Sequence, residues 1–168
     1  FTSRTQDGVA TPVTGVFLDS AAPWTGPGER PTVIVAPGTV GQGDKCAPSV
    51  AFANGIYADI DTGMPSISVN QEAASAALWS ARGARVFVTD YIGLGTPGIH
   101  TYVNRRESGH AVLDAARAAN SLSGTGSETP LLFWGYSQGG GATAAAAELQ
   151  PTYAPELNLR GVWAGGPV

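Results

Sequence analysis

Short strands of the fully buried type alternate with helices over most of the chain, and this alternation constrains the fold more than any other feature. Residues 32–36 form a continuous β-branched run, which is typical of a strand covered on both faces in a parallel sheet. Similar apolar runs occur at residues 86–89, 131–134 and 159–164. An earlier strand is expected at residues 13–18.

The segments between these strands have helical patterns. Small apolar residues recur at helical spacing over residues 70–82, 107–122 and 138–149. Asn70 is suited to cap the first of these helices, and Pro151 is expected to end the third. Strands that alternate with helices predict right-handed crossovers, and therefore an α/β fold with a mostly parallel sheet and helices on both faces.

Composition excludes several classes of function. The 168 residues are enough for one domain, and no linker or internal repeat divides them. The net charge is −4, and the single lysine, Lys45, and the scattered arginines form no basic stripe, so nucleic acid is not an expected partner. No apolar run approaches the roughly 20 residues that a bilayer-spanning helix needs, so no transmembrane segment is expected.

The chemical signal with the most specific context is Gly135-Tyr136-Ser137-Gln138-Gly139, which lies directly between a predicted strand and a predicted helix. This context is that of a nucleophile elbow, a sharp turn that exposes the serine hydroxyl above the sheet. The strained turn needs residues without side chains two positions before and after the serine, and Gly135 and Gly139 meet that need. The alternative is a glycine-rich turn with an inert serine, as in a flavodoxin-like domain.

The same turn predicts where an oxyanion would bind. The backbone N–H of Gln138 and the positive end of its helix point toward that place. A second N–H is expected from the glycine-rich loop of residues 36–44, where Thr39 follows the glycine of the turn and Val40 is the next candidate. A plain flexible loop is the alternative for this segment.

A hydrolase of this type also needs a histidine and an acid, which follow the serine in the chain. After Ser137 there is no histidine or aspartate, and both His100 and His110 precede it. We therefore expect these two histidines to be structural, and their spacing does not predict a metal site. Residues 93–98 match G-x-G-x-x-G, but Pro97 interrupts the pattern and no helix is predicted to open there, so no nucleotide cofactor is expected.

The missing acid and base, and a sheet that usually continues for about two further strands, indicate an incomplete unit. We expect residues 1–168 to be the N-terminal half of one α/β-hydrolase domain. The C-terminal half, with the lid, is expected downstream in the same precursor or on a second chain.

Five motifs in order give a family resemblance. Together they resemble the secretory lipase family of fungi and actinobacteria, in its Candida lipase A-like, actinobacterial type. The motifs are Gly43-Asp44-Lys45-Cys46-Ala47-Pro48-Ser49, Thr89-Asp90-Tyr91-Ile92-Gly93, residues 112–119, Gly135-Tyr136-Ser137-Gln138-Gly139-Gly140 and Tyr153-Ala154-Pro155-Glu156-Leu157-Asn158.

The resemblance implies a secreted serine esterase or triacylglycerol lipase that acts on acylglycerols or other acyl esters through an acyl-enzyme. Ser137 matches the family nucleophile and Gln138 the oxyanion donor of the elbow. An ungapped match places Val40 at the second donor, whereas the turn favours Thr39. Cys46 matches a cysteine that forms a disulfide in the family, here to a residue outside this chain. An acyltransferase on the same scaffold and a non-catalytic binding module with the hydrolase fold are the alternative functions.

Overall fold

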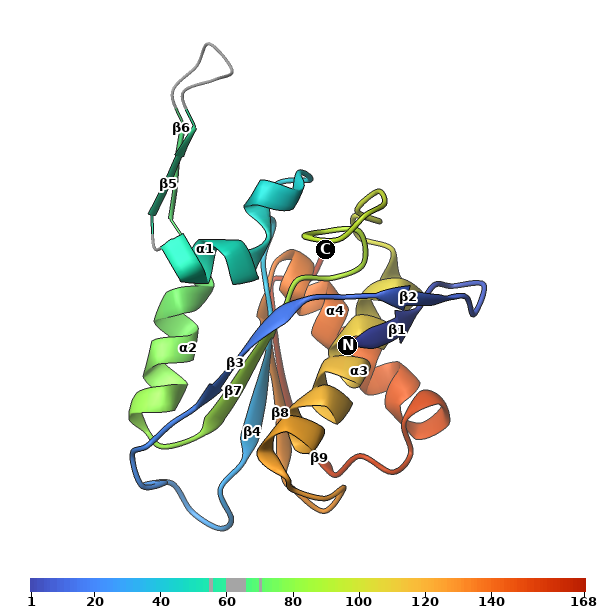
Figure 1. The fold of residues 1–168 in the computed structure, drawn as a ribbon. Helices are drawn as coiled ribbons and strands as arrows, with labels where there is room; N and C mark the ends of the chain where they lie inside the picture. The colour runs from blue at the N-terminus through green and yellow to red at the C-terminus, as the bar shows by residue number, and fades with distance from the viewer. Residues whose placement is uncertain (55, 60–65, 70) are drawn as a thin grey trace.

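The computed structural model describes residues 1–54, 56–59, 66–69 and 71–168. Its central sheet has five strands, and four of them run parallel (Figure 1). Only the outer strand β3 runs antiparallel, and it pairs with β7. The predicted mostly parallel sheet is therefore confirmed. In spatial order the strands are β3 (Gly15–Asp19), β7 (Arg85–Thr89), β4 (Thr32–Ala36), β8 (Leu131–Tyr136) and β9 (Leu159–Gly165).

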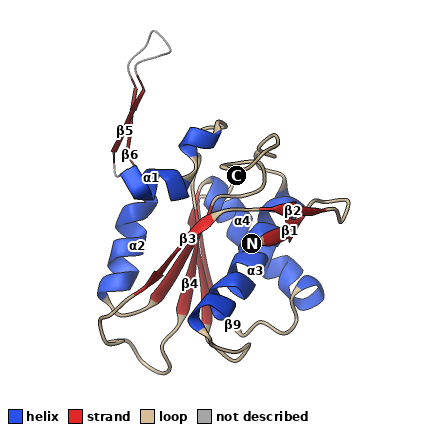
Figure 2. Cartoon of the chain, in the orientation of Figure 1, coloured by secondary structure: helices blue, strands red, loops and turns tan. Residues whose placement is uncertain are grey.

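Helices cover both faces of the sheet, as the sequence predicted (Figures 1 and 2). Helix α1 (Pro48–Asn54) and helix α2 (Gln71–Ala81) lie on one side. Helix α3 (Arg105–Ser123) and helix α4 (Gln138–Tyr153) lie on the other. The expected cap of α2, Asn70, falls outside the described residues.

Side chains that alternate along the central strand supply both layers of the core. Val33 and Val35 of β4 pack with Ala76 of α2 on one face. Ile34 of the same strand packs with Phe133 and with apolar side chains of α3 and α4 on the other face. Because both faces of β4 are covered, every residue of the strand is buried, which explains its unbroken apolar run.

Helix α4 corrects one expectation, because it continues through Pro151 to Tyr153 instead of ending at the proline. A proline removes its own N–H bond from the helix and its ring crowds the carbonyl four residues earlier, so other bonds must compensate. The side-chain amide of Gln150 donates to the backbone carbonyl of Ala154 at 3.0 Å. The backbone N–H of Ala154 donates to the backbone carbonyl of Gln150, also at 3.0 Å. Arg117 of α3 also donates to the Tyr153 carbonyl at 2.8 Å, so tertiary and capping bonds hold the last turn.

Several short elements lie outside the sequence-based assignment. Each is too short to show a periodic apolar pattern, which is why the sequence did not predict them. They are the paired strands β1 (Thr2–Arg4) and β2 (Ala10–Pro12), the 3₁₀ turn η1 (Asp44–Cys46), the seven-residue helix α1, and the paired strands β5 (Ile56–Asp59) and β6 (Ser66–Val69).

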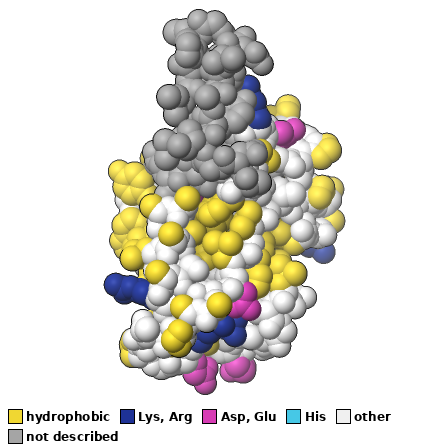
Figure 3. Space-filling model, turned by 60° about the vertical axis from the view of Figure 1, so that its left-hand side comes forward, with side chains coloured by type: hydrophobic (Ala, Val, Ile, Leu, Met, Phe, Trp, Pro, Cys, Tyr) yellow, Lys and Arg dark blue, Asp and Glu magenta, His cyan; other side chains and the backbone are white. Residues whose placement is uncertain are grey.

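The surface carries few charges on the side of α2, where hydrophobic side chains lie between uncharged ones (Figure 3). This agrees with a chain in which only 13% of residues are charged. Of the helices in the described part of the chain, none has both the length and the apolar character to cross a bilayer.

Helix α4 begins in close contact with the ends of β4 and β8, and this approach requires glycine. A Cβ atom at Gly139 would lie 2.0 Å from the Ala36 carbonyl oxygen, and one at Gly135 would lie 2.2 Å from the Gly139 carbonyl oxygen. No real side chain fits at these distances. Close backbone packing thus explains why both positions require glycine.

We predict that Gly139→Ala lowers the free energy of unfolding by about 1–3 kcal/mol, the usual cost of overpacking. The measurement is urea unfolding followed by tryptophan fluorescence. The matched control is Gly126→Ala, because a Cβ at Gly126 meets no atom within 4 Å, and it should stay within about 0.5 kcal/mol of the parent. Equal stability of the two variants would contradict the close approach.

Candidate active site

Ser137 occupies the sharp turn between β8 and α4 in a strained conformation. Its backbone has φ 57° and ψ −119°, a region that non-glycine residues rarely adopt. The surroundings hold this conformation, because the Ser137 N–H donates to the Gly165 carbonyl at 2.9 Å and its carbonyl accepts from the Gly141 N–H at 3.0 Å. The residue is half-buried.

The first turn of α4 supplies hydrogen-bond donors next to this serine. Backbone N–H groups in the first turn of a helix have no partner within the helix, and the helix dipole makes that end positive. Gln138 is the first residue of α4, and its side chain is buried, with Nε2 3.0 Å from Nε2 of His100. The side-chain bond fixes Gln138 while leaving its backbone N–H for a ligand.

The loop after β4 lies directly against this turn. A Cβ at Gly38 would be 3.5 Å from the Tyr136 carbonyl oxygen, which precedes Ser137 in the chain. Thr39 is exposed, with its hydroxyl 3.1 Å from the Tyr102 hydroxyl, and Val40 is half-buried. Within the described residues, the backbone N–H groups of Thr39 and Val40 have no hydrogen-bond partner. Both remain candidates for the second oxyanion donor.

Both histidines are structural, as the sequence indicated. His100 is 5% exposed, and its Nδ1 lies 3.1 Å from the Ile92 carbonyl oxygen while Nε2 faces Gln138. A carbonyl can only accept, so Nδ1 carries the proton and Nε2 accepts from the Gln138 amide. His110 is hydrogen-bonded through Nδ1 to the Arg4 carbonyl at 2.9 Å, and its ring stacks on the Tyr153 ring with 4.1 Å between the ring centroids. Neither ring is free to act as a base for Ser137.

Two buried groups that the sequence analysis did not single out as site residues hold the loop after β4. Glu72 of α2 is 8% exposed, and its Oε1 accepts from the Gly38 N–H at 2.9 Å. Tyr91, at the carboxyl end of β7, donates its hydroxyl to the Pro37 carbonyl at 2.8 Å. Tyr91 belongs to one of the family-like motifs, so the sequence carried a signal for it. Glu72 carried none, because an acid in the first turn of a helix is common for electrostatic reasons.

Burial shapes the ionisation of both groups. Desolvation raises the pKa of the Glu72 carboxyl above its usual value, and the hydrogen bond from Gly38 opposes that rise. Desolvation and then the nearby charge of Glu72 raise the pKa of Tyr91 well above its usual value. Tyr91 therefore remains a protonated donor at neutral pH.

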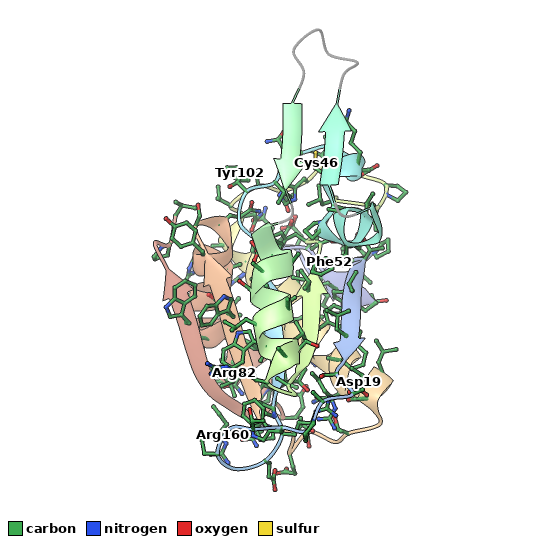
Figure 4. All side chains as sticks on the ribbon, turned by 90° about the vertical axis from the view of Figure 1, so that its left-hand side faces the viewer. Asp19, Cys46, Phe52, Arg82, Tyr102 and Arg160 are labelled. Carbon is green, nitrogen blue, oxygen red and sulfur yellow. The ribbon has the colours of Figure 1, made fainter. Side chains whose placement is uncertain are left out.

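Cys46 lies beside the same loop, at the upper end of the sheet in Figure 4, as does Tyr102. It is the single cysteine of the chain, and its thiol is free and half-buried. A Cβ at Gly41, whose φ is 114°, would lie 2.8 Å from its sulfur. The sulfur thus packs against the loop that follows β4. The proposed disulfide of Cys46 stays a prediction.

One surface hollow lies away from Ser137. A hollow of about 980 Å³ is lined by Trp24, Trp79, Arg82 and Arg160, among others. Figure 4 places Arg82 and Arg160 at the end of the molecule opposite Cys46. Across the ranges described, no three His, Cys, Asp or Glu side chains gather as metal ligands would. No helix opens at the end of residues 93–98, since the next one, α3, begins at Arg105.

Comparisons with known proteins agree on one family. The family model for secretory lipases matches residues 60–168. Lipase 9 of Candida albicans is 36% identical over 126 residues, which cover 72% of this chain and 26% of that protein. A probable inactive lipase of Mycobacterium tuberculosis is 33% identical over 156 residues, which cover 82% of this chain and 32% of that protein.

The fold comparison extends over nearly the whole chain. The structure of Candida antarctica lipase A in its closed state superposes with a TM-score of 0.69 at 22% identity, covering 96% of this chain and 35% of that one. The architecture is accordingly part of an α/β-hydrolase fold. The matched part of the chain spans about a quarter to a third of the length of these relatives. Because the family model matches more than half of its residues, the chain belongs to the secretory lipase family.

Proposed function

We propose that this chain carries the nucleophile and the oxyanion-binding groups of a secreted serine hydrolase that cleaves acylglycerols or other acyl esters. The observation that carries the proposal is the backbone of Ser137, strained at φ 57° beside the unpaired N–H groups at the start of α4. Strain of this kind persists where the surroundings enforce it, and it is concentrated at catalytic sites. Membership of the secretory lipase family supports ester hydrolysis and export from the cell.

In the proposed reaction, Ser137 Oγ attacks the ester carbonyl carbon while a histidine takes its proton. The carbonyl oxygen becomes an oxyanion that accepts from the N–H of Gln138 and from that of Thr39 or Val40. The bond to the alcohol oxygen then breaks, and the histidine returns its proton to the leaving alcohol. Water attacks the acyl-enzyme in the same way and releases the fatty acid.

The proposal takes the histidine and its acid from outside these residues, because His100 and His110 each hydrogen-bond a backbone carbonyl elsewhere in the fold. We propose that they lie in a C-terminal half, on the same precursor or on a second chain. The edge strand β9 supports this, because an exposed edge strand is open to pairing with a further strand. Trp163 of β9 is 43% exposed, and its ring stacks on that of Trp134 with 4.2 Å between the ring centroids. An apolar surface is therefore exposed at this strand, where a further segment could pack.

A non-catalytic module is the second candidate, because one relative is described as a probable inactive lipase. The two candidates differ in a single observable property, which is the nucleophilicity of Ser137. The strained turn supports the enzyme, because backbone strain of this kind clusters at active sites.

We predict that Ser137→Ala, made in the complete reading frame that carries this chain, lowers kcat for a p-nitrophenyl ester by at least about 10⁴-fold. The variant should also lose labelling by a fluorophosphonate probe. Ser127→Ala serves as the control, because Ser127 is an exposed serine in a turn, and it should keep parental activity. An unreactive parent protein would instead support the binding module.

We further predict that residues 1–168 expressed alone react with the fluorophosphonate at least about 1,000-fold more slowly than the complete protein, because no histidine activates the serine. Mass spectrometry of the labelled peptide gives the rate at Ser137, and circular dichroism shows whether the helices have formed. Labelling of the isolated chain at the rate of an intact lipase would show that the proposed C-terminal half is unnecessary.

Cys46 tests the proposed compartment. We expect peptide mapping of the secreted complete protein, without reduction, to find Cys46 joined to a cysteine outside residues 1–168, as an oxidising environment allows. Cys46→Ser should lower the thermal midpoint, since removal of a native disulfide typically costs about 2–5 kcal/mol. Alkylation of Cys46 by iodoacetamide before any reduction would refute the disulfide.

A further inference from the structure

The peptide bond between Pro37 and Gly38 is held at both of its polar atoms. Its carbonyl oxygen accepts from the Tyr91 hydroxyl at 2.8 Å, and its N–H donates to Glu72 Oε1 at 2.9 Å. The bond is trans, so the carbonyl and the N–H point in opposite directions. The two partners therefore hold the same peptide plane from opposite sides, and the plane cannot rotate without breaking one of the bonds.

This plane controls the next N–H groups along the chain. Gly38 has no side chain to restrict its backbone, so an unrestrained loop would let the following peptide turn freely. With the Pro37–Gly38 plane fixed, only two dihedral angles separate it from the peptide that carries the Thr39 N–H. Fixing the first plane removes every rotation before Gly38, so the φ and ψ angles of Gly38 alone still set the direction of the Thr39 N–H, and the Val40 N–H follows it along the chain.

Burial protects both hydrogen bonds to this peptide. Glu72 and Tyr91 are 8% and 2% exposed, so water does not compete strongly for either hydrogen bond. The carboxylate bond is charge-assisted, which makes it stronger than a bond between neutral groups. The Tyr91 ring also stacks on the His100 ring, with 6.0 Å between the ring centroids, and His100 Nε2 accepts from the side-chain amide of Gln138. One connected set of side chains therefore contacts both segments that carry candidate oxyanion donors, the loop after β4 and the start of α4.

We propose that Glu72 and Tyr91 are positioning residues, which fix the Pro37–Gly38 peptide so that the N–H of Thr39 or Val40 is aligned with the oxyanion that forms at Ser137. The inference rests on the proposed ester hydrolysis. A donor that is misaligned in the transition state lowers kcat and leaves ground-state binding nearly unchanged.

The test uses the complete protein and p-nitrophenyl butyrate. Loss of one oxyanion donor costs about 100- to 1,000-fold, so a donor that is displaced but present should cost about 10- to 100-fold in kcat. We expect Glu72→Leu and Tyr91→Phe each to show this loss, with KM unchanged within about twofold. Glu72→Gln retains an acceptor oxygen for Gly38 and should restore kcat to within about threefold of the parent.

The double variant Glu72→Leu/Tyr91→Phe separates alignment from general destabilisation. Both residues act on one peptide plane, so the double variant should lose little more kcat than either single variant. The matched control is Tyr153→Phe, which removes another tyrosine hydroxyl bond, 2.7 Å to Asp114 Oδ2, far from the elbow. It should lose stability while kcat stays unchanged.

The outcomes distinguish the two proposals. If the parent protein does not hydrolyse the ester through Ser137, the proposed function fails. If the parent is active and folded Glu72→Leu and Tyr91→Phe retain the parental kcat, the positioning role is overturned. Should Glu72→Leu fail to fold, Tyr91→Phe decides alone. An equal loss in Glu72→Gln and Glu72→Leu would also overturn the role, because the acceptor would not matter.

Discussion

The close approach of two backbones governs this structure. The start of α4 contacts the end of β4 so tightly that a methyl group at Gly139 would lie 2.0 Å from the Ala36 carbonyl oxygen. That contact sets the helix against the sheet, forces the chain to turn sharply at Ser137, and brings the loop after β4 beside the first turn of α4. Every element of the candidate site depends on these positions, because the serine and both sets of N–H groups belong to the two segments in contact.

Polar side chains then fix what backbone packing alone leaves free. Glycine in the loop after β4 allows the close approach but also allows rotation, and a preorganised oxyanion site cannot tolerate rotation. Glu72, Tyr91 and His100 come from different segments and converge on the two candidate donor segments. Their burial raises the cost of leaving any of them unpaired, so the network favours one arrangement.

The sequence predicted the features that repeat or have a local cause. The run at β4 follows from burial on both faces, and the glycines around Ser137 follow from steric exclusion; both causes act within a short segment of sequence. Glu72 was not predictable in its role, because its partner, Gly38, lies 34 residues away and only the fold brings them together. Pro151 was misinterpreted for a related reason, since bonds from Arg117 and within the last turn outweigh the local preference of proline.

The most direct measurement is a crystal structure of the complete protein after reaction with a phosphonate that mimics the tetrahedral intermediate. We expect phosphorus bonded to Ser137 Oγ, with one phosphonyl oxygen within about 3.1 Å of the Gln138 N–H nitrogen and of the Thr39 or Val40 nitrogen. A phosphonyl group bonded to Ser137 whose oxygens face solvent, with these nitrogens unoccupied, would contradict the assignment of the two segments as one oxyanion site.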